Sequence, residues 1–147
     1  FMDADLATDL EALPRLLQEL ESHDLVAGSR WISGAKVSRS LVRRFVSWGY
    51  SLVTRAFLTS VVHDTVCGFK GMTRDAARQI LPMVKDAGFF FDTELIALAH
   101  QSRLRIKEIP VNSREPRVRD RETKVPILAT MWRDLCALAA LRRRLRP

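Results

Sequence analysis

The chain has 147 residues, of which 47% are hydrophobic, so it is long and apolar enough for one domain with a buried core and is not a disordered tail. No apolar run is long enough to span a bilayer, and the N-terminus lacks the basic flank of a signal peptide, so we expect a soluble or peripheral protein. The net charge of +7 is concentrated after position 111, where ten basic and four acidic residues give +6. A basic terminal segment suits anionic lipid or nucleic acid, and composition does not choose between them.

The first residues, FMDADLAT, place two carboxylates one residue apart. If Phe1 and Met2 end a strand, Asp3 and Asp5 point to the same side of the chain where that strand stops. Two such carboxylates form a site for a hard cation such as Mg²⁺ or Mn²⁺. The alternative is that the acidic residues only cap the next helix, and for an isolated D-x-D pattern this is the commoner case.

A helix of about 14 residues is expected next, because Thr8–Glu11 has the form of a capping box and leucines recur at helical spacing at positions 10, 13, 17 and 20. Residues 25–30 (LVAGSR) have the pattern of a short buried strand. A second helix is expected over 38–59, with a broad apolar face that includes Phe45, Leu52 and Phe57. Strand, loop, helix and strand in this order predict an α/β domain.

The second half continues this alternation. Thr73 is expected to cap a short helix that ends near Pro82, a further helix begins near Asp92, and residues 104–111 (LRIKEIPV) form a strand. The last helix, 125–145, carries an apolar stripe and is followed by a cluster of arginines, so it is either an interfacial helix or a helix packed on its own domain. Cys67 and Cys136 lack zinc-site spacing and are interpreted as buried or inert thiols.

Taken in chain order, several segments resemble the second half of a family 2 glycosyltransferase: MDADLAT, GSRW, VRRFVSWGY, HDTVCGFKGMTRDAA, FFFDTELIALA, IKEIPV and TKV. More narrowly, they are similar to the dolichyl-phosphate and polyprenyl-phosphate hexose synthases, which move a sugar from UDP-glucose or GDP-mannose to a lipid phosphate. A lone D-x-D is a weak signal, but D-A-D, G-S-R, C-G-F-K and F-D-x-E in this order form a specific one. The resemblance implies an α/β fold of the GT-A type, a Rossmann-like sheet flanked by helices.

The resemblance also implies that this GT-A fold is partial. In the family, strands that seat the nucleotide base and ribose come before the D-x-D, and the sequence before Asp3 contains none. We expect residues 1–124 to be the C-terminal part of a catalytic domain and residues 125–147 to be a basic amphipathic helix at the membrane interface. The isolated chain is expected to bind nucleotide poorly, to transfer no sugar, and to favour a homodimer through an unpaired sheet edge.

Roles for individual residues follow from the resemblance. Asp5 would be the main ligand of Mg²⁺ or Mn²⁺, with Asp3 assisting at the metal or the ribose, and Asp5, Arg30 and Arg44 would be the catalytic set. The acceptor phosphate would be surrounded by Arg30, Arg43, Arg44, Ser47, Arg117 and Lys124. Lys70, Asp92 and Glu94 would position the sugar or a loop.

Each of these roles has a simpler alternative. Arg43 and Arg44 would look the same as a polar helix face, and Lys70 the same as a solvated lysine. Helix capping accounts for Asp92 and Glu94 as well as sugar contacts do. Ala7 stands where mannosyl members commonly carry Gln, which favours UDP-glucose as the donor over GDP-mannose.

The implied reaction inverts C1 of the sugar on the cytoplasmic face of a membrane, with a nucleotide sugar and a polyprenyl or dolichyl phosphate as substrates. No general base is required, because a lipid phosphate, with a second pKa near ~6, is mostly ionised at neutral pH. The alternative from another class is a non-catalytic basic module for nucleic acid or a protein partner. We expect no nucleic acid, because no aromatic residue is interleaved with the arginines of the last helix for base stacking. A degenerate, inactive relative is a third possibility, and the presence of both Asp3 and Asp5 argues against it.

Overall fold

The computed structural model describes residues 1–3, 7–38, 41–58, 62–114 and 127–145, with side chains for all of these except 41–44, 58, 114 and 127–131. A three-stranded sheet has the order β3-β1-β4. Its strands are β1 (Leu25–Ser29), β3 (Lys70–Met72) and β4 (Ile106–Pro110), and β1 pairs antiparallel with β3 and parallel with β4. A second sheet pairs β2 (Val37–Ser38) with β5 (Ser113–Arg114). The expected α/β class is confirmed.

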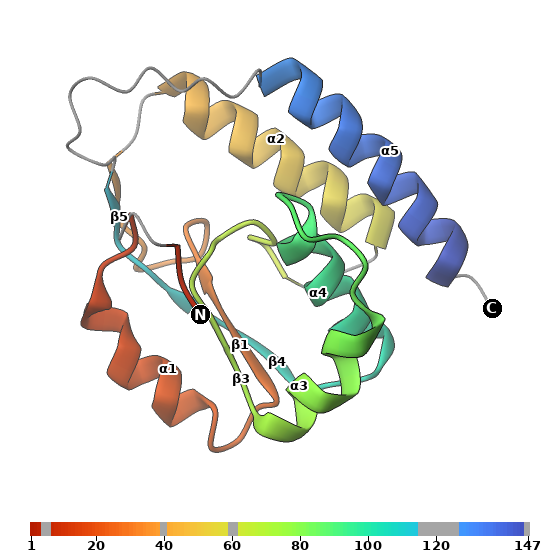
Figure 1. Cartoon of the computed structure of the whole chain (residues 1–147). Helices are drawn as coiled ribbons and strands as arrows, with labels where there is room; N and C mark the ends of the chain where they lie inside the picture. The colour runs from red at the N-terminus through yellow and green to blue at the C-terminus, as the bar shows by residue number, and fades with distance from the viewer. Residues whose placement is uncertain (4–6, 39–40, 59–61, 115–126, 146–147) are drawn as a thin grey trace.

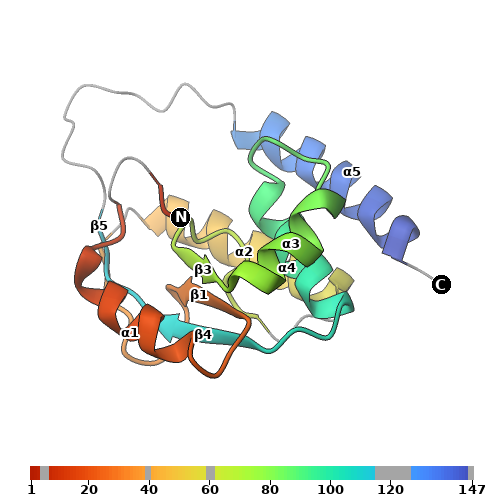
Figure 2. The ribbon, with the colours of Figure 1, turned by 60° about the horizontal axis from the view of Figure 1, so that its bottom comes forward.

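The helices lie on both faces of the three-stranded sheet (Figures 1 and 2). The 3-10 turn η1 (Leu10–Ala12) and helix α1 (Leu13–Glu19) cover one face, and α3 (Arg74–Ile80), the 3-10 turn η2 (Leu81–Met83) and α4 (Phe91–Gln101) lie on the other side. Helices α2 (Leu41–Leu58) and α5 (Ile127–Leu145) lie side by side as an outer layer beyond α4. The sheet is therefore covered on both faces, with its strand ends left for a site.

Three clusters of buried side chains hold these layers together. Alternate residues of β1 point to opposite faces, so Leu25 and Ala27 pack under α4 while Val26 packs under α1. The third cluster joins α4 to α5 and consists of Phe90, Ala97, Leu138 and Leu141. The apolar stripe of α5 is thus in part a packing surface on its own domain.

The start of the second half matches the expected elements. Thr73 caps α3, and its hydroxyl accepts a hydrogen bond from Ala76 N at 3.2 Å. Helix α4 begins one residue before Asp92, and β4 lies within the expected strand. The expected domain boundary between residues 124 and 125 lies outside the described residues.

The capping box expected at Thr8–Glu11 does not form. Thr8 is held in an antiparallel bridge with Ser113, so its backbone is extended, and Asp9 takes the position before η1 without a side-chain capping bond. Of the expected stripe of leucines only Leu20 packs against the core. Leu10, Leu13 and Leu17 are exposed, and the fully buried leucine of the helix is Leu16. The sheet contact through Leu16, rather than the leucine spacing, sets the orientation of α1.

Helix α2 was predicted at the correct place, but its inner face was not. Of the apolar face expected inside, Phe45, Leu52 and Phe57 are 70%, 52% and 38% exposed, and Val53 packs against the core. The buried side of the helix carries hydroxyl groups instead: Tyr50 hydrogen-bonds Thr93, Thr54 hydrogen-bonds Thr65, and Ser51 is buried beside them. These hydroxyl pairs let a polar helix face pack against the domain, which leaves the aromatic face outside.

Candidate functional site

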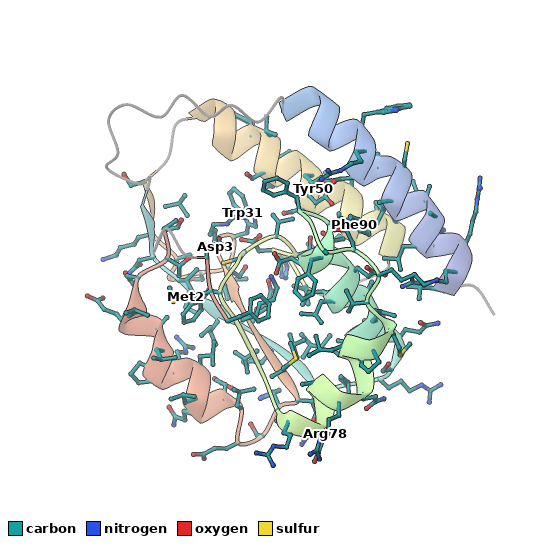
Figure 3. All side chains as sticks on the ribbon, in the orientation of Figure 1. Met2, Asp3, Trp31, Tyr50, Arg78 and Phe90 are labelled. Atoms are coloured by element: carbon teal, nitrogen blue, oxygen red, sulfur yellow. The ribbon has the colours of Figure 1, made fainter. Side chains whose placement is uncertain are left out.

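The candidate site lies where β1 and β4 end and β3 begins, next to the first residues of the chain. Asp3 N donates to Gly68 O at 2.9 Å, Lys70 N donates to Phe1 O at 3.0 Å, and Met2 pairs with Phe69 in an antiparallel bridge. Figure 3 shows Asp3 and Trp31 at this end of the sheet. The strand end expected at Phe1–Met2 is thus present as an isolated antiparallel bridge and not as a longer strand.

Asp3 lies directly over Gly68, in space that any other residue at position 68 would need. A Cβ built on Gly68 would overlap all three atoms of the Asp3 carboxylate group. The missing side chain therefore creates the seat for this carboxylate. A carboxylate held at a strand end in this way suits a hard cation such as Mg²⁺ or Mn²⁺.

The second carboxylate of the D-x-D, Asp5, lies outside the described residues, as do Arg117 and Lys124. Within the described part of the chain, no three His, Cys, Asp or Glu side chains come together as a metal site. The expected metal pair of Asp3 and Asp5 therefore stays a prediction.

Lys70 is buried beneath this seat, so its interpretation as a solvated lysine is wrong. Its side chain has no exposed area, and Nζ donates to Cys67 O and, at 2.6 Å, to Asp92 Oδ1. The Phe1 ring lies 5.9 Å from the ammonium. Lys70 and Asp92 therefore brace the turn that contains Gly68, and Asp92 at the start of α4 is 22% exposed.

Arg30 lies beside this turn and is clamped by Asp64, a residue to which the sequence interpretation gave no role. Asp64 Oδ2 accepts from Arg30 N at 3.0 Å and from Nε at 2.6 Å, and Oδ1 accepts from Nη2 at 2.8 Å. Burial alone would lower the pKa of Arg30, but the hydrogen bonds and charge of Asp64, with smaller contributions from Cys67 and Asp3, raise it above its ordinary value. The guanidinium is thus permanently charged and fixed close to Asp3.

Glu108, a further residue that the sequence interpretation missed, holds Asp64 in place and also contacts His63. Glu108 on β4 accepts from Asp64 N at 3.0 Å through Oε1, and its Oε2 lies 2.7 Å from His63 Nδ1. One signal in the sequence indicates that Asp64 belongs to the site: it stands in the motif segment HDTVCGFKG, three residues before Cys67. Its partners are 34 and 44 residues away, so no local pattern links them.

The remaining acceptor-phosphate candidates lie on α2. Arg43 and Arg44 lie in the first turn of the helix, where the structure describes the backbone alone. Ser47 follows one turn later and is half-buried. Ser47, Ser51 and Thr54 follow one another at spacings of four and three residues, so they share one helix face. That face reaches Thr65, the neighbour of Asp64, so Ser47 lies on the side of α2 that packs towards the Arg30–Asp64 pair.

Glu94 is fully enclosed and joins three segments. Its Oε2 accepts from Lys85 N at 3.0 Å and Asp86 N at 2.8 Å, and its Oε1 accepts from Arg144 of α5. Burial would raise the pKa of Glu94, but the two backbone bonds and Arg144 together lower it. Glu94 thus positions the loop before α4, and Arg144 belongs to an internal ion pair rather than to a free basic cluster.

This ion pair predicts an acid-sensitive part of the stability. Because the pKa of Glu94 is lowered from 4.5 on folding, its stabilisation is present above pH 4.5 and is lost as pH falls through the folded pKa. Glu94→Gln should lower the free energy of unfolding by about 2 kcal/mol at pH 7, with a smaller difference at acid pH. Urea unfolding from pH 7 to pH 3 measures this, with the exposed Glu11→Gln as control. A difference that stays constant over that range would contradict the prediction.

Comparison with known proteins gives relatives over most of the chain, although no protein-family model matches it. Glycosyltransferase AglD of Haloferax volcanii is 35% identical over 114 residues, which cover 76% of this chain and 18% of that protein. Dolichyl-phosphate beta-glucosyltransferase ALG5C of Trichomonas vaginalis is 31% identical over 146 residues, 94% of this chain and 43% of that protein. Undecaprenyl-phosphate mannosyltransferase of Micrococcus luteus is 34% identical over 112 residues, which cover 75% of this chain and 46% of that protein.

The chain spans less than half the length of each of these relatives. The matches nevertheless include both glucosyl and mannosyl enzymes whose names specify a polyprenyl-type phosphate. The chain therefore belongs to the family 2 glycosyltransferases of the polyprenyl-phosphate hexosyltransferase type.

Proposed function

We propose that the chain carries the metal-binding and acceptor-binding side of an inverting hexosyltransferase with a GT-A fold. The donor is a nucleotide sugar, UDP-glucose in preference to GDP-mannose, and the acceptor is a polyprenyl or dolichyl phosphate. Several relatives are named as dolichyl-phosphate glucosyltransferases, which supports the glucosyl donor. Ala7, where mannosyl members commonly carry Gln, is buried and has no side-chain oxygen to offer a metal.

One observation carries this proposal: at the same end of the sheet, the Asp3 carboxylate is seated over Gly68 and the Arg30 guanidinium is held by Asp64. An acidic group that can hold a cation and a fixed guanidinium are the two charges that a diphosphate donor and a phosphate acceptor require. Asp3 and Asp5 would hold Mg²⁺ or Mn²⁺, and the ion would neutralise the diphosphate leaving group. Arg30, with Arg43, Arg44 and Ser47 from α2, would orient the acceptor phosphate towards C1 of the sugar.

The acceptor oxygen needs orientation rather than deprotonation. A phosphate monoester has a second pKa near ~6, so at neutral pH its oxygen attacks without losing a proton to a base. Arg30 meets this requirement because Asp64 fixes its orientation while leaving it charged. Asp92 and Lys70 are occupied with each other, which supports a role in holding the Gly68 turn rather than in proton transfer.

A transfer assay tests the proposal in the protein as the cell makes it. Radiolabelled glucose from UDP-glucose should appear in a β-linked lipid phosphate when polyprenyl phosphate and Mn²⁺ are supplied, and GDP-mannose should be a poorer donor. Product with an α linkage would contradict inversion. Transfer to neither lipid phosphate with either donor would contradict the function itself.

The proposed partner surface is the cytoplasmic face of a membrane, and the outer layer of helices supports contact with a membrane surface. Among the described residues no helix is long and apolar enough to cross a bilayer. Helix α2 nevertheless exposes Phe45 and Trp48, and α5 exposes Trp132, which is 71% exposed and is followed directly by the exposed Arg133. Exposed aromatic rings beside basic residues are typical of interfacial helices.

Removing one outward ring should weaken vesicle binding. Trp132→Ser is expected to reduce binding to vesicles containing phosphatidylglycerol about fivefold, since a ring partly buried at the interface contributes less than the ~1.5–3 kcal/mol of full burial. Co-sedimentation measures this. The matched control is Leu17→Ser. Leu17 is 58% exposed and lies on α1, on the other side of the sheet. Equal losses for both variants, or no binding by the unmodified chain, would refute the membrane surface.

Basic residues for the same assay must be chosen with the structure in view. Arg144 pairs with buried Glu94, and Arg142 stacks over Phe57 at 5.3 Å. A variant that changes the whole cluster of Arg142, Arg143, Arg144 and Arg146 would therefore mix lost folding with lost binding. Arg133→Gln and Arg143→Gln test the charge alone, and their effect should disappear at high salt.

A further inference from the structure

We propose that Asp64 is the positioning residue of Arg30, which it holds in the one orientation that presents the remaining guanidinium N–H groups to a phosphate. This inference rests on the proposed function, in which Arg30 binds the acceptor. Asp64 is completely buried and accepts three hydrogen bonds from Arg30, one from the backbone and two from the side chain. A single carboxylate thus fixes both the backbone and the side chain of Arg30.

The clamp leaves Arg30 able to bind an anion. A guanidinium carries five N–H groups in a rigid fork. Asp64 takes one from Nε and one from Nη2, so three remain to donate. Arg30 is 8% exposed, and it lies near Asp3, where the donor diphosphate is expected. The N–H groups that Asp64 does not take are the part of Arg30 that this proposal assigns to the acceptor phosphate.

The segment that carries Asp64 is itself held by hydrogen bonds, so Asp64 is the anchored partner of the pair. Glu108 binds its backbone N–H from β4, and the neighbouring Thr65 hydroxyl bonds Thr54 of α2 at 3.2 Å. The segment that carries Asp64 is thus tied to the sheet on one side and to the acceptor helix on the other. If Arg30 moved, its hydrogen bonds to the Asp64 carboxylate would break, because Asp64 is held in place by other segments.

Stability alone gives a poor reason for burying this pair. The cost of removing two charges from water is often as large as the attraction between them, so a buried ion pair is retained more readily for orientation than for folding energy. The chain contains a second Arg–Asp pair with the same three bonds, Arg105 to Asp24, at the opposite end of β1. That pair is largely exposed, with Arg105 66% accessible, and it joins only the starts of β1 and β4.

The two pairs give a matched experiment on the 147-residue chain, with farnesyl monophosphate and inorganic phosphate as probes. Calorimetric titration should show that Asp64→Asn weakens binding of farnesyl monophosphate about tenfold, while Asp24→Asn leaves it unchanged. Arg30→Gln should weaken binding of farnesyl monophosphate by at least the same factor. Asp64→Asn added to Arg30→Gln should have no further effect, because Asp64 acts only through Arg30. Additive losses would mean that Asp64 has a merely structural role, and would overturn the inference.

A second variant keeps the test decisive if Asp64→Asn does not fold. Arg30→Lys retains the buried charge pair but lacks the fork, so it should lose affinity about as much as Arg30→Gln. Binding by Arg30→Lys as tight as by the unmodified chain would show that charge alone matters and would overturn the positioning role. Wild-type affinity in Arg30→Gln, or no binding of either phosphate by the unmodified chain, would instead show that Arg30 is not part of an acceptor site, and would contradict the proposed function.

The two probes also separate a lipid phosphate from free phosphate. If the chain binds inorganic phosphate as tightly as farnesyl monophosphate, the ligand of Arg30 is free phosphate and not a lipid phosphate. That result would contradict the lipid acceptor but not the positioning role of Asp64.

Discussion

Asp5→Ala is expected to lower hexose transfer at least about 100-fold in the protein as the cell makes it, with the fold unchanged. Asp5 is assigned as the main metal ligand by its place in the D-x-D, and the first Asp of that motif has its carboxylate at the strand end. A divalent ion that stabilises the leaving diphosphate contributes several kcal/mol, and each ~1.4 kcal/mol corresponds to a tenfold change in rate. The initial rate with UDP-glucose and polyprenyl phosphate, at saturating Mn²⁺, is the quantity to measure.

The control for this variant is another acidic residue of the same segment. Glu11→Ala removes an exposed carboxylate of η1 and should leave the rate unchanged. Circular dichroism should give the same spectrum for both variants and the parent. Normal turnover by Asp5→Ala, or full activity of the parent in EDTA, would show that the D-x-D does not hold a catalytic metal.

Gly68→Ala is expected to weaken Mn²⁺ binding by about 10- to 100-fold while changing stability little. The new methyl group would occupy the place of the Asp3 carboxylate, and a short side chain at the surface can rotate away without disturbing the core. Loss of a correctly oriented ligand or of its support typically costs this much in metal affinity. Titration of Mn²⁺ followed by electron paramagnetic resonance measures the affinity, and urea unfolding measures the stability.

The chain offers a glycine at which the same substitution should have no effect on the metal. A Cβ on Gly49 of α2 would meet no atom within 4 Å, so Gly49→Ala should keep the Mn²⁺ affinity and stabilise the helix by about 0.5–1 kcal/mol. If Gly68→Ala binds Mn²⁺ as tightly as Gly49→Ala does, then Asp3 is not a ligand. If Gly68→Ala unfolds, the turn is needed for folding and the seat must be tested by Asp3→Asn.

Sequence patterns located most elements of the fold but not the orientation of two helices. Thr73 was predicted as a cap because its hydroxyl reaches a backbone N–H three residues away, which is a local interaction. The apolar residues of α2 were expected inside because apolar periodicity normally marks the buried face. Hydroxyl pairs with Thr65 and Thr93, which are distant in sequence, reverse that orientation, and periodicity contains no information about them.

The same distinction applies to the candidate site. Family resemblance identified Arg30, Lys70 and Glu94, since each stands in a recognisable motif. It did not reveal that each of them is paired, because Asp64, Asp92 and Arg144 come from segments 22 to 50 residues away. A buried lysine and a solvated one are identical in sequence, and only the packing of Lys70 against the Gly68 turn separates them.

The two cysteines of the chain differ in a way that is useful at the bench. Cys67 is enclosed beside the Gly68 turn, and burial raises the pKa of its thiol, so it resists alkylation. Cys136 is exposed on α5 one helical turn after Trp132. A maleimide dye or nitroxide therefore attaches to the native sequence at a single position, on the helix whose depth in a lipid headgroup layer such a label would report.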